Sequence, residues 1–264
     1  MGIADARHRS DPGSGRGRSG ETSRGSDTMT RIRALFGVAA VAMAIGLWFA
    51  LTAPPDTLQG QYSRIINVHV PSLWLAFLAF GVTALGSIVW LWKKTQRWDR
   101  LASASAEIGV LFTGIGLFSG MVWGQAVWGR AWDWGDPRLT TTAVMFFVYL
   151  GYIALRNALD DPVVKARRSA ILGVVAVVQV PLVYFSVNLF RTLHPIQSIT
   201  PAGSGLPSEI LNPMLVNVAA FTILYVALMA ARTDVARTEE TFQESELLAG
   251  DAVKPPKLSE VKDV

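Results

Sequence analysis

The chain has 264 residues, of which 51% are hydrophobic and only 17% are charged, and its mean hydropathy is +0.34. It contains no cysteine, which excludes disulfides, CxxC redox chemistry and thiolate ligands. The pI near 9.6 would suit a nucleic-acid-binding protein, but the basic residues lie between long apolar runs, where they are typical of membrane topology. Runs of about 18 or more apolar residues predict helices that cross a membrane.

The N-terminal segment, 1–30, is rich in Arg, Gly, Ser and Asp, a composition that predicts a disordered tail. Met29 stands directly before Thr-Arg-Ile-Arg, so Met1 and Met29 are both candidate start sites. The first apolar run, 34–51, is longer than the ~7–15-residue core of a secretion signal. The run is therefore interpreted as an uncleaved membrane anchor.

Five further apolar runs predict five more membrane-spanning helices. They are expected at about 71–92, 101–123, 140–159, 169–189 and 213–231. Pro71 is expected to open the first of these, because the first helical turn needs no amide donor, and Pro181 is expected to kink its span. The predicted fold class is therefore all-α: a polytopic membrane protein with six transmembrane helices in one domain, 31–231. A flexible cytoplasmic tail, 232–264, is expected to follow it.

The distribution of Lys and Arg predicts which side of the membrane each loop faces. The short loops at 93–101 and 156–168 together carry eight of these residues, and the two tails carry twelve more. The opposite side carries only four: Arg64, Arg130, Arg138 and Arg191. Because cytoplasmic loops are enriched in Lys and Arg, both termini are expected in the cytoplasm and these four arginines at the outer face.

One outer segment, 123–140, is exceptionally rich in tryptophan. It contains four of the chain's nine Trp: Trp123, Trp128, Trp132 and Trp134. It also carries two acids and two arginines: Asp133, Asp136, Arg130 and Arg138. Its Gly and Pro residues disfavour a helix interior, so the segment is predicted to be a loop that forms an aromatic platform with charged corners.

Two histidines are predicted at the depth of this loop, His69 before the second span and His194 after the fifth. Two imidazoles, indoles and arginines suit haem: imidazoles ligate the iron, indoles stack on the porphyrin and arginines pair with propionates. The competing interpretation is an interfacial Trp belt with hydrogen-bonded surface histidines. The position of both histidines beside the loop favours the haem site.

Three motifs at these positions resemble the CcmC type of cytochrome c maturation protein, part of a haem-handling group with a tryptophan-rich, or WWD, outer loop. The motifs are Asn67-Val-His69-Val-Pro71-Ser-Leu-Trp74, the segment from Trp123 to Arg138-Leu-Thr140, and Ser186-Val-Asn-Leu-Phe-Arg191-Thr-Leu-His194. The resemblance covers roughly residues 34–231. The family has Trp directly before the acid, whereas Gly135 separates Trp134 from Asp136 here, so Asp133 and Asp136 both stay candidates for the acidic position.

The resemblance implies roles for particular residues. His69 and His194 would be the axial ligands of the haem iron. The platform that meets haem and the chaperone would consist of Trp123, Trp128, Trp132, Trp134, Asp136 and Arg138. The candidate propionate partners would be Arg64, Arg130 and Arg191.

The resemblance also implies a function. The protein would bind haem b, non-covalently and transiently, at the outer face of the cytoplasmic (inner) membrane and present it to a haem chaperone of the CcmE type. Its other partners would be membrane lipid and the subunits of an ABC-type complex, namely a CcmA-type ATPase, a CcmB-type permease and a small CcmD-type subunit, with no nucleic acid. The chain has no P-loop pattern, so ATP hydrolysis would come from a partner.

The chain is not expected to be an enzyme, apart from haem-lyase-like assistance in loading the chaperone. Two alternative functions are an electron-transfer haem protein that interacts with quinol and a transporter subunit without haem. The sequence leaves open whether the protein moves haem across the bilayer or receives it at the outer leaflet.

Overall fold

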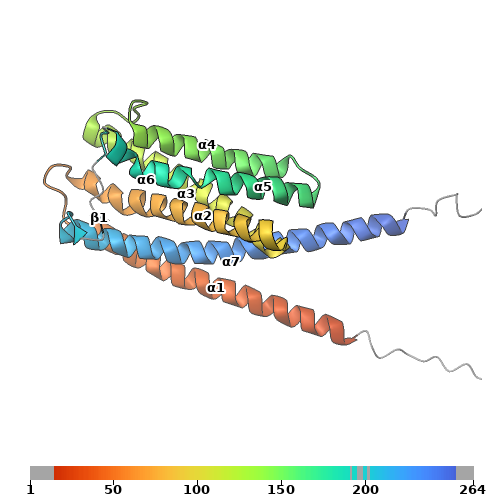
Figure 1. Cartoon of the computed structure of the whole chain (residues 1–264). Coiled ribbons are helices and arrows are strands. Elements are labelled where there is room, and N and C mark those ends of the chain that lie inside the picture. The colour runs from red at the N-terminus through yellow and green to blue at the C-terminus, as the bar shows by residue number, and fades with distance from the viewer. Residues whose placement is uncertain (1–14, 191, 195–198, 201–202, 254–264) are drawn as a thin grey trace, which may run out of the picture.

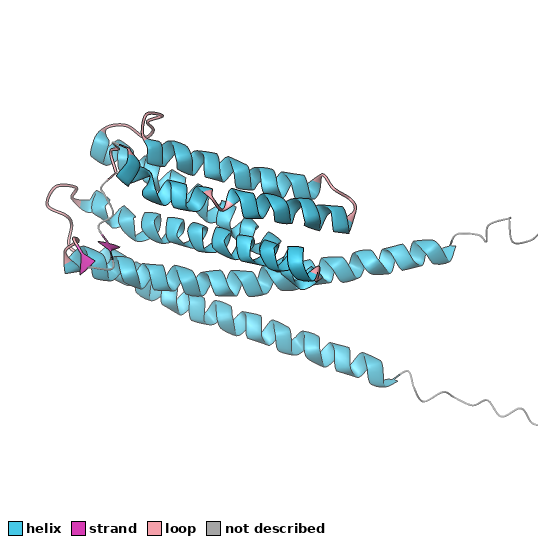
Figure 2. Ribbon diagram, viewed as in Figure 1, coloured by secondary structure: helices cyan, strands magenta, loops and turns pink. Residues whose placement is uncertain are grey.

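The computed structural model describes residues 15–190, 192–194, 199–200 and 203–253. They form a bundle of long helices that lie side by side (Figure 1). The helices are α1 (Gly15–Thr52), a 3-10 turn η1 (Gln61–Ile65), α2 (Ile66–Lys93), α3 (Gln96–Trp128), α4 (Pro137–Asn157), α5 (Pro162–Ala176), α6 (Gln179–Leu189) and α7 (Ser208–Val253). Figure 2 shows a small hairpin, in which β1 (Ile199–Thr200) pairs antiparallel with β2 (Gly203–Ser204).

Six stretches of helix in the described residues are long and apolar enough to cross a membrane. They are Ser26–Thr52, Gln61–Lys93, Gln96–Trp128, Pro137–Asn157, Pro162–Leu189 and Ser208–Gln243. This finding confirms the predicted all-α, polytopic fold. Successive spans run in opposite directions, so α1 begins and α7 finishes at the same end of the bundle, away from the loop between α3 and α4 (Figure 1).

Both terminal helices extend beyond the predicted spans. Helix α1 begins at Gly15, within the segment 1–30 that composition predicted as disordered, and α7 continues past residue 231 to Val253. A helix that has nucleated in an apolar run gains one hydrogen bond for each residue it adds, which explains helical extension into polar flanks. Residues 1–14 and 254–264 lie outside the described residues.

The two prolines singled out in the sequence have different outcomes. The fifth span is interrupted at Val177 and Val178, between α5 and α6, which is where Pro181 would disturb the helix, and a kink there stays a prediction. The proline ring crowds the carbonyl four residues earlier, that of Val177, and provides no amide to bond it. The prediction that Pro71 opens a helix is wrong, because α2 begins at Ile66 and encloses Pro71, which is fully buried.

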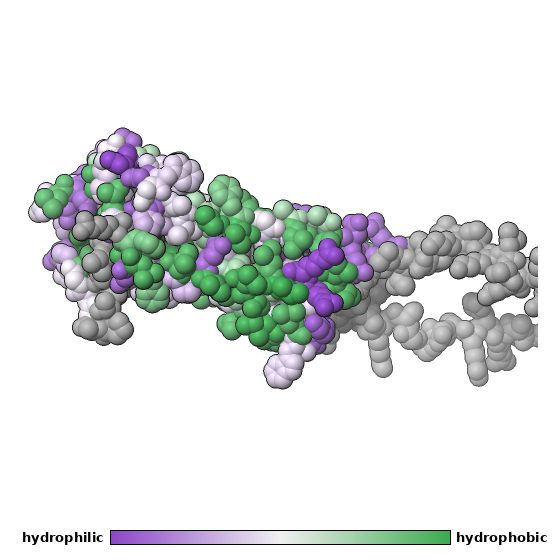
Figure 3. Space-filling model, turned by 45° about the horizontal axis from the view of Figure 1, so that its top comes forward, coloured by the Kyte–Doolittle hydropathy of each residue, from purple (hydrophilic) through white to green (hydrophobic). Residues whose placement is uncertain are grey.

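Close packing at the centre of the bundle depends on small residues. Helices α2 and α3 carry buried alanines at Ala76, Ala79, Ala104 and Ala106. Small side chains let helix backbones approach closely, which is how helices associate where lipid replaces water. Figure 3 shows apolar residues over the middle of one face and more hydrophilic residues toward its ends, as expected of a molecule that spans a bilayer.

Candidate functional site

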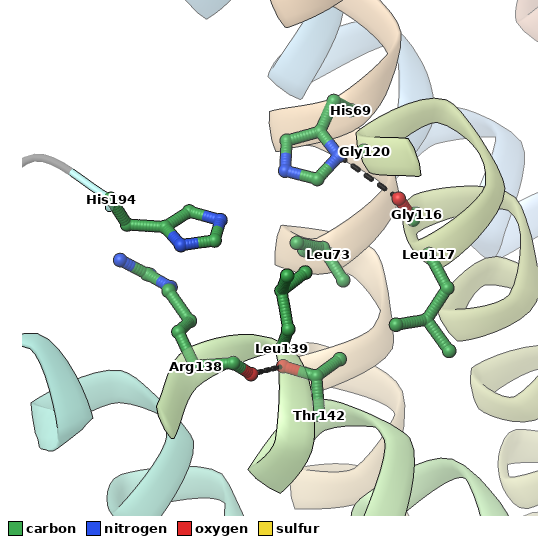
Figure 4. Close-up of a pocket in the computed structure, with 9 residues that line it drawn as sticks. All are labelled: His69, Leu73, Gly116, Leu117, Gly120, Arg138, Leu139, Thr142 and His194. Atoms are coloured by element: carbon green, nitrogen blue, oxygen red, sulfur yellow. Dashed lines mark hydrogen bonds between the residues drawn. The ribbon is translucent and has the colours of Figure 1, made fainter. Parts of the chain in front are cut away.

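A small cavity lies where α2, α3 and α4 meet the segment after α6. Its volume is about 20 Å³, room for about one water molecule. It is lined by His69, Leu73, Gly116, Leu117, Gly120, Arg138, Leu139, Thr142 and His194 (Figure 4). The fold therefore brings both predicted histidines and one predicted arginine to one place.

The His69 imidazole is held against helix α3. Its Nδ1 lies 3.0 Å from the carbonyl oxygen of Gly116 and 3.3 Å from the hydroxyl of Ser119. Because a carbonyl oxygen only accepts, Nδ1 must be the donor, and the lone pair is left on Nε2. A Cβ atom at Gly120 would come within 2.8 Å of the His69 ring, so a glycine is needed here for the ring to lie against α3.

The His194 imidazole is held by a carboxylate instead. Its Nδ1 lies 3.3 Å from Asp136, and its ring packs edge-to-face on Trp128 with the ring centroids 5.1 Å apart. Burial lowers the pKa of His194 while the Asp136 carboxylate opposes that shift, so the imidazole is neutral at physiological pH. Figure 4 shows the rings of His69 and His194 on opposite sides of the same cavity.

The buried carboxylate of Asp136 connects three parts of the site. It caps α4 by accepting from the Leu139 amide at 3.0 Å, and it also accepts from the Thr192 hydroxyl and, at 2.8 Å, from the Leu193 amide. Burial opposes ionisation, yet these hydrogen bonds hold the pKa of Asp136 below its usual value. An ionised carboxylate only accepts, so His194 Nδ1 carries the proton and Nε2 is free for a metal.

The other acidic candidate, Asp133, lies in a different environment. It forms an ion pair with Arg130 at 2.8 Å and accepts from the Gly135 amide at 2.8 Å. The Arg130 side chain is 58% exposed. Of the two acids that the sequence left open, Asp136 is therefore the one that contacts a histidine.

The tryptophans form two pairs rather than one flat platform. The prediction of a loop from residue 123 onward is wrong in its first part, because α3 continues to Trp128 and only residues 129–136 connect it to α4. Trp123 and Trp128 meet edge-to-face with centroids 4.6 Å apart, beside His194. Trp132 and Trp134 form a second edge-to-face pair at 5.1 Å, in which Trp134 is 73% exposed.

The four outer arginines take different positions. Arg138 lines the cavity, and its guanidinium lies beside the His194 ring, on the side away from His69 (Figure 4). Arg64 donates to the carbonyl oxygen of Ala53 at 2.9 Å and so connects η1 to the residue that follows α1. Arg130 pairs with Asp133, and Arg191 lies outside the described residues.

The site contains residues that the sequence interpretation missed. Gly116 and Ser119 hold the His69 ring, Gly120 makes room for it, and Thr192 contacts both Asp136 and His194. The spacing Gly116-x-x-x-Gly120 was a usable signal, because two small residues four apart mark a close helix contact in membranes. No local pattern marks Thr192, because its partner Asp136 is 56 residues away.

The side chains that line the cavity are chemically suited to a planar metal complex with anionic edges. Two Nε2 atoms face one cavity, leucines from α2, α3 and α4 form its walls, and Arg138 supplies a positive charge. The cavity is too small for a macrocycle as it stands, so the two imidazoles must separate to admit one. His69 lies on a long helix, whereas His194 lies on a short non-helical segment, so His194 is the side expected to move.

Comparison with known proteins identifies the family. The family model CcmC, described as Heme exporter protein C, matches residues 21–246. A Heme exporter protein C of Bradyrhizobium diazoefficiens is 39% identical over 203 residues, covering 75% of this chain and 76% of the relative. That of Haemophilus influenzae is 34% identical over 217 residues, covering 81% and 84%. A ccmC-like mitochondrial protein of cytochrome c biosynthesis from Marchantia polymorpha is 34% identical over 185 residues, covering 70% and 77%.

The matched region includes all six apolar spans, both cavity histidines and the Trp-rich segment. The chain therefore belongs to the CcmC family, Heme exporter protein C.

Proposed function

We propose that this protein handles haem for cytochrome c maturation: it binds haem b between His69 and His194 and presents it to a haem chaperone of the CcmE type. Membership of the Heme exporter protein C family supports the general role. The observation that carries the specific proposal is the pair of imidazoles, each with Nδ1 held by an acceptor and Nε2 free toward one cavity.

The two histidines have different tasks in this proposal. His69 and His194 would hold a bound haem, which would supply an iron centre that imidazoles can ligate. His69, fixed on α2 and against α3, acts as the permanent ligand that sets the position of the macrocycle. His194, held by hydrogen bonds outside any helix, acts as the ligand that can withdraw. Transient binding requires one such releasable ligand, and without cysteine the chain forms no thioether bond to haem.

The surrounding residues orient the haem and exclude water. Leu73, Leu117 and Leu139 provide apolar contact for the porphyrin, and Arg138 is the arginine placed to pair with a propionate. Trp128 supports the His194 ring from the side. The exposed indole of Trp134 lies on the surface that the chaperone is proposed to meet.

The proposed location is the cytoplasmic (inner) membrane, with both termini in the cytoplasm and the haem site at the outer face. The basic loops at 93–101 and 156–168 support this orientation. The proposed assembly is an ABC-type complex with CcmA-type, CcmB-type and CcmD-type subunits. The chain is proposed to position a cofactor for other proteins rather than to catalyse a reaction, and the ATPase subunit would hydrolyse the ATP.

The proposal is tested by haem titration of the purified full-length protein and of His69→Ala and His194→Ala. Each substitution is expected to abolish the absorption spectrum of iron ligated by two imidazoles and to weaken haem binding by at least the ~10–100-fold typical of lost support around a metal. His8→Ala is the matched control, since His8 is the third histidine of the chain and lies far from the cavity in sequence. Unchanged spectra in both cavity variants would refute the ligand assignment.

A further inference from the structure

We propose that Thr192 is a positioning residue that locks His194 onto Asp136 and thereby keeps its ring oriented toward the cavity. This inference rests on the proposed role of His194 as a haem ligand and deepens it. Thr192 lies on the non-helical segment between α6 and the cavity, two residues before His194. Its side chain contacts both His194 and Asp136, the carboxylate that orients the His194 ring.

The Thr192 hydroxyl has three contacts that meet at one point. It donates to Oδ2 of Asp136, accepts from the backbone amide of His194 at 3.1 Å, and lies 3.5 Å from His194 Nδ1. A hydroxyl can donate and accept at the same time, and no apolar side chain of similar size can do either. The hydroxyl therefore fixes the backbone of His194 and the carboxylate that orients its ring.

Among the described residues, the other contacts that restrain His194 are weak or indirect. Its own contact with Asp136 is 3.3 Å long, beyond the usual 2.7–3.2 Å range for an N–H···O bond. The Leu193 amide provides one bond to Asp136, and Trp128 provides an edge contact. By contrast, His69 lies within α2, and its ring is held by the Gly116 carbonyl oxygen and the Ser119 hydroxyl of α3, neither of which involves Thr192. Loss of the Thr192 hydroxyl should therefore loosen the second histidine and leave the first in place.

The Thr192 hydroxyl limits the orientations open to the His194 ring. It bonds the His194 amide and the Asp136 carboxylate that orients the imidazole, so it restrains both the backbone and the ring of the histidine. His194 can ligate iron only while its Nε2 points into the cavity. A substitution that removes the hydroxyl raises the share of other ring orientations and so weakens the ligation by His194.

The experiment compares Thr192→Val with Thr192→Ser in the purified full-length protein. Thr192→Val is expected to bind haem ~10–100-fold more weakly, which is the usual loss when a residue that orients a metal ligand is replaced. It is also expected to lose much of the absorption spectrum of iron ligated by two imidazoles. Thr192→Ser keeps the hydroxyl and is expected to resemble the parent. Thr141→Val is the matched control, because the Thr141 hydroxyl bonds only carbonyls of its own helix, those of Pro137 and Arg138.

A second measurement needs no haem. Hydrogen–deuterium exchange of the peptide that contains residues 192–194 is expected to be faster in haem-free Thr192→Val than in Thr141→Val, because the His194 amide loses its acceptor. Thr192→Ala removes the same hydroxyl without adding a methyl group and serves as the second variant if the valine disturbs assembly. Faster exchange together with a changed spectrum supports the inference.

Two outcomes overturn the inference. If exchange and haem spectrum both equal those of Thr141→Val, the hydroxyl does not restrain the segment. If exchange rises while the spectrum is unchanged, the restraint does not position the ligand. His194→Ala separates the two proposals: if it loses the spectrum while Thr192→Val keeps it, the haem-ligand assignment stands and only the role of Thr192 fails.

Discussion

His69 and His194 both direct Nε2 toward the cavity, but different kinds of hydrogen-bond acceptor hold their Nδ1 atoms. A backbone carbonyl of α3 orients His69, and a carboxylate from the segment before α4 orients His194. In metal sites an acceptor on one ring nitrogen fixes the tautomer and the direction of the other nitrogen. In the proposed haem site, the acceptors Gly116 and Asp136 would therefore matter as much as the imidazoles that they orient.

The first prediction at this scale distinguishes the two acids of the Trp-rich segment. Asp136→Asn is expected to weaken haem binding by ~10–100-fold. The amide has an NH₂ group in place of one acceptor oxygen, and that group cannot accept the hydrogen bonds from Thr192, Leu193 and His194. Asparagine caps helices as well as aspartate does, so α4 should still begin at Pro137. Haem titration followed by absorbance measures the change.

Asp133→Asn is the control for that prediction. Asp133 pairs with the exposed Arg130, and exposed pairs contribute only about 0–1 kcal/mol. Its haem affinity should equal that of the parent. An equal loss of affinity in both variants would contradict the assignment of Asp136 as the acid of the site.

At the scale of elements, an ion pair connects α3 and α4 at the end of the bundle opposite the cavity. Asp99 lies in the first turn of α3 and Arg156 in the last turn of α4, and they form a two-pronged ion pair at 2.7 and 2.8 Å. Each charge has the sign that its helix terminus favours. Asp99 is almost fully buried, so the pair fixes α3 and α4 relative to each other and, through them, the far ends that carry the site.

We predict that Asp99→Asn lowers the free energy of unfolding by about 3–5 kcal/mol, because it leaves the Arg156 guanidinium charged and unpaired in a buried place. Asp133→Asn again serves as control, with an expected cost below about 1 kcal/mol for its exposed pair. Reversible unfolding in detergent, followed by circular dichroism, measures both. Equal stabilities would mean that the α3–α4 pair does not hold the bundle together.

At the scale of the whole molecule, the up-and-down order of the spans separates the two ends of the bundle. The cavity, the Trp-rich segment and the hairpin lie at one end, and the start of α1 and the finish of α7 lie at the other (Figure 1). The even number of spans produces this result without any contact between the ends. The basic loops then predict which end faces the cytoplasm.

The absence of cysteine permits a direct test of this orientation. Leu58→Cys, on the 95% exposed side chain before η1, is expected to react with a membrane-impermeant maleimide added to intact spheroplasts. Thr95→Cys, in the short basic loop between α2 and α3, is expected to react only after the membrane is opened. The cysteine-free parent is the control, and the reverse labelling pattern would place the haem site on the cytoplasmic side.

Much of the fold could be predicted from the sequence, because membrane spans are local properties. Each apolar run has to become a helix in a bilayer, since only internal hydrogen bonds satisfy its backbone there. Helix boundaries were less predictable. Trp123 to Trp128 continue α3 despite the glycine at 124, and α2 begins before Pro71, because the packing of neighbouring helices outweighs the preferences of single residues.

The sequence by itself determined the number of spans, the position of His69 and His194 at one depth, and the nearness of the Trp-rich segment to both. Only the tertiary structure decided that Asp136 rather than Asp133 contacts a histidine, that the indoles form two pairs, and that Thr192 completes the site. The physical reason is the distance along the chain between the residues that interact. Span length and charge distribution act along the chain, whereas the contact between Asp136 and Thr192 joins residues 56 apart, and it exists only after α4 and α6 have packed together.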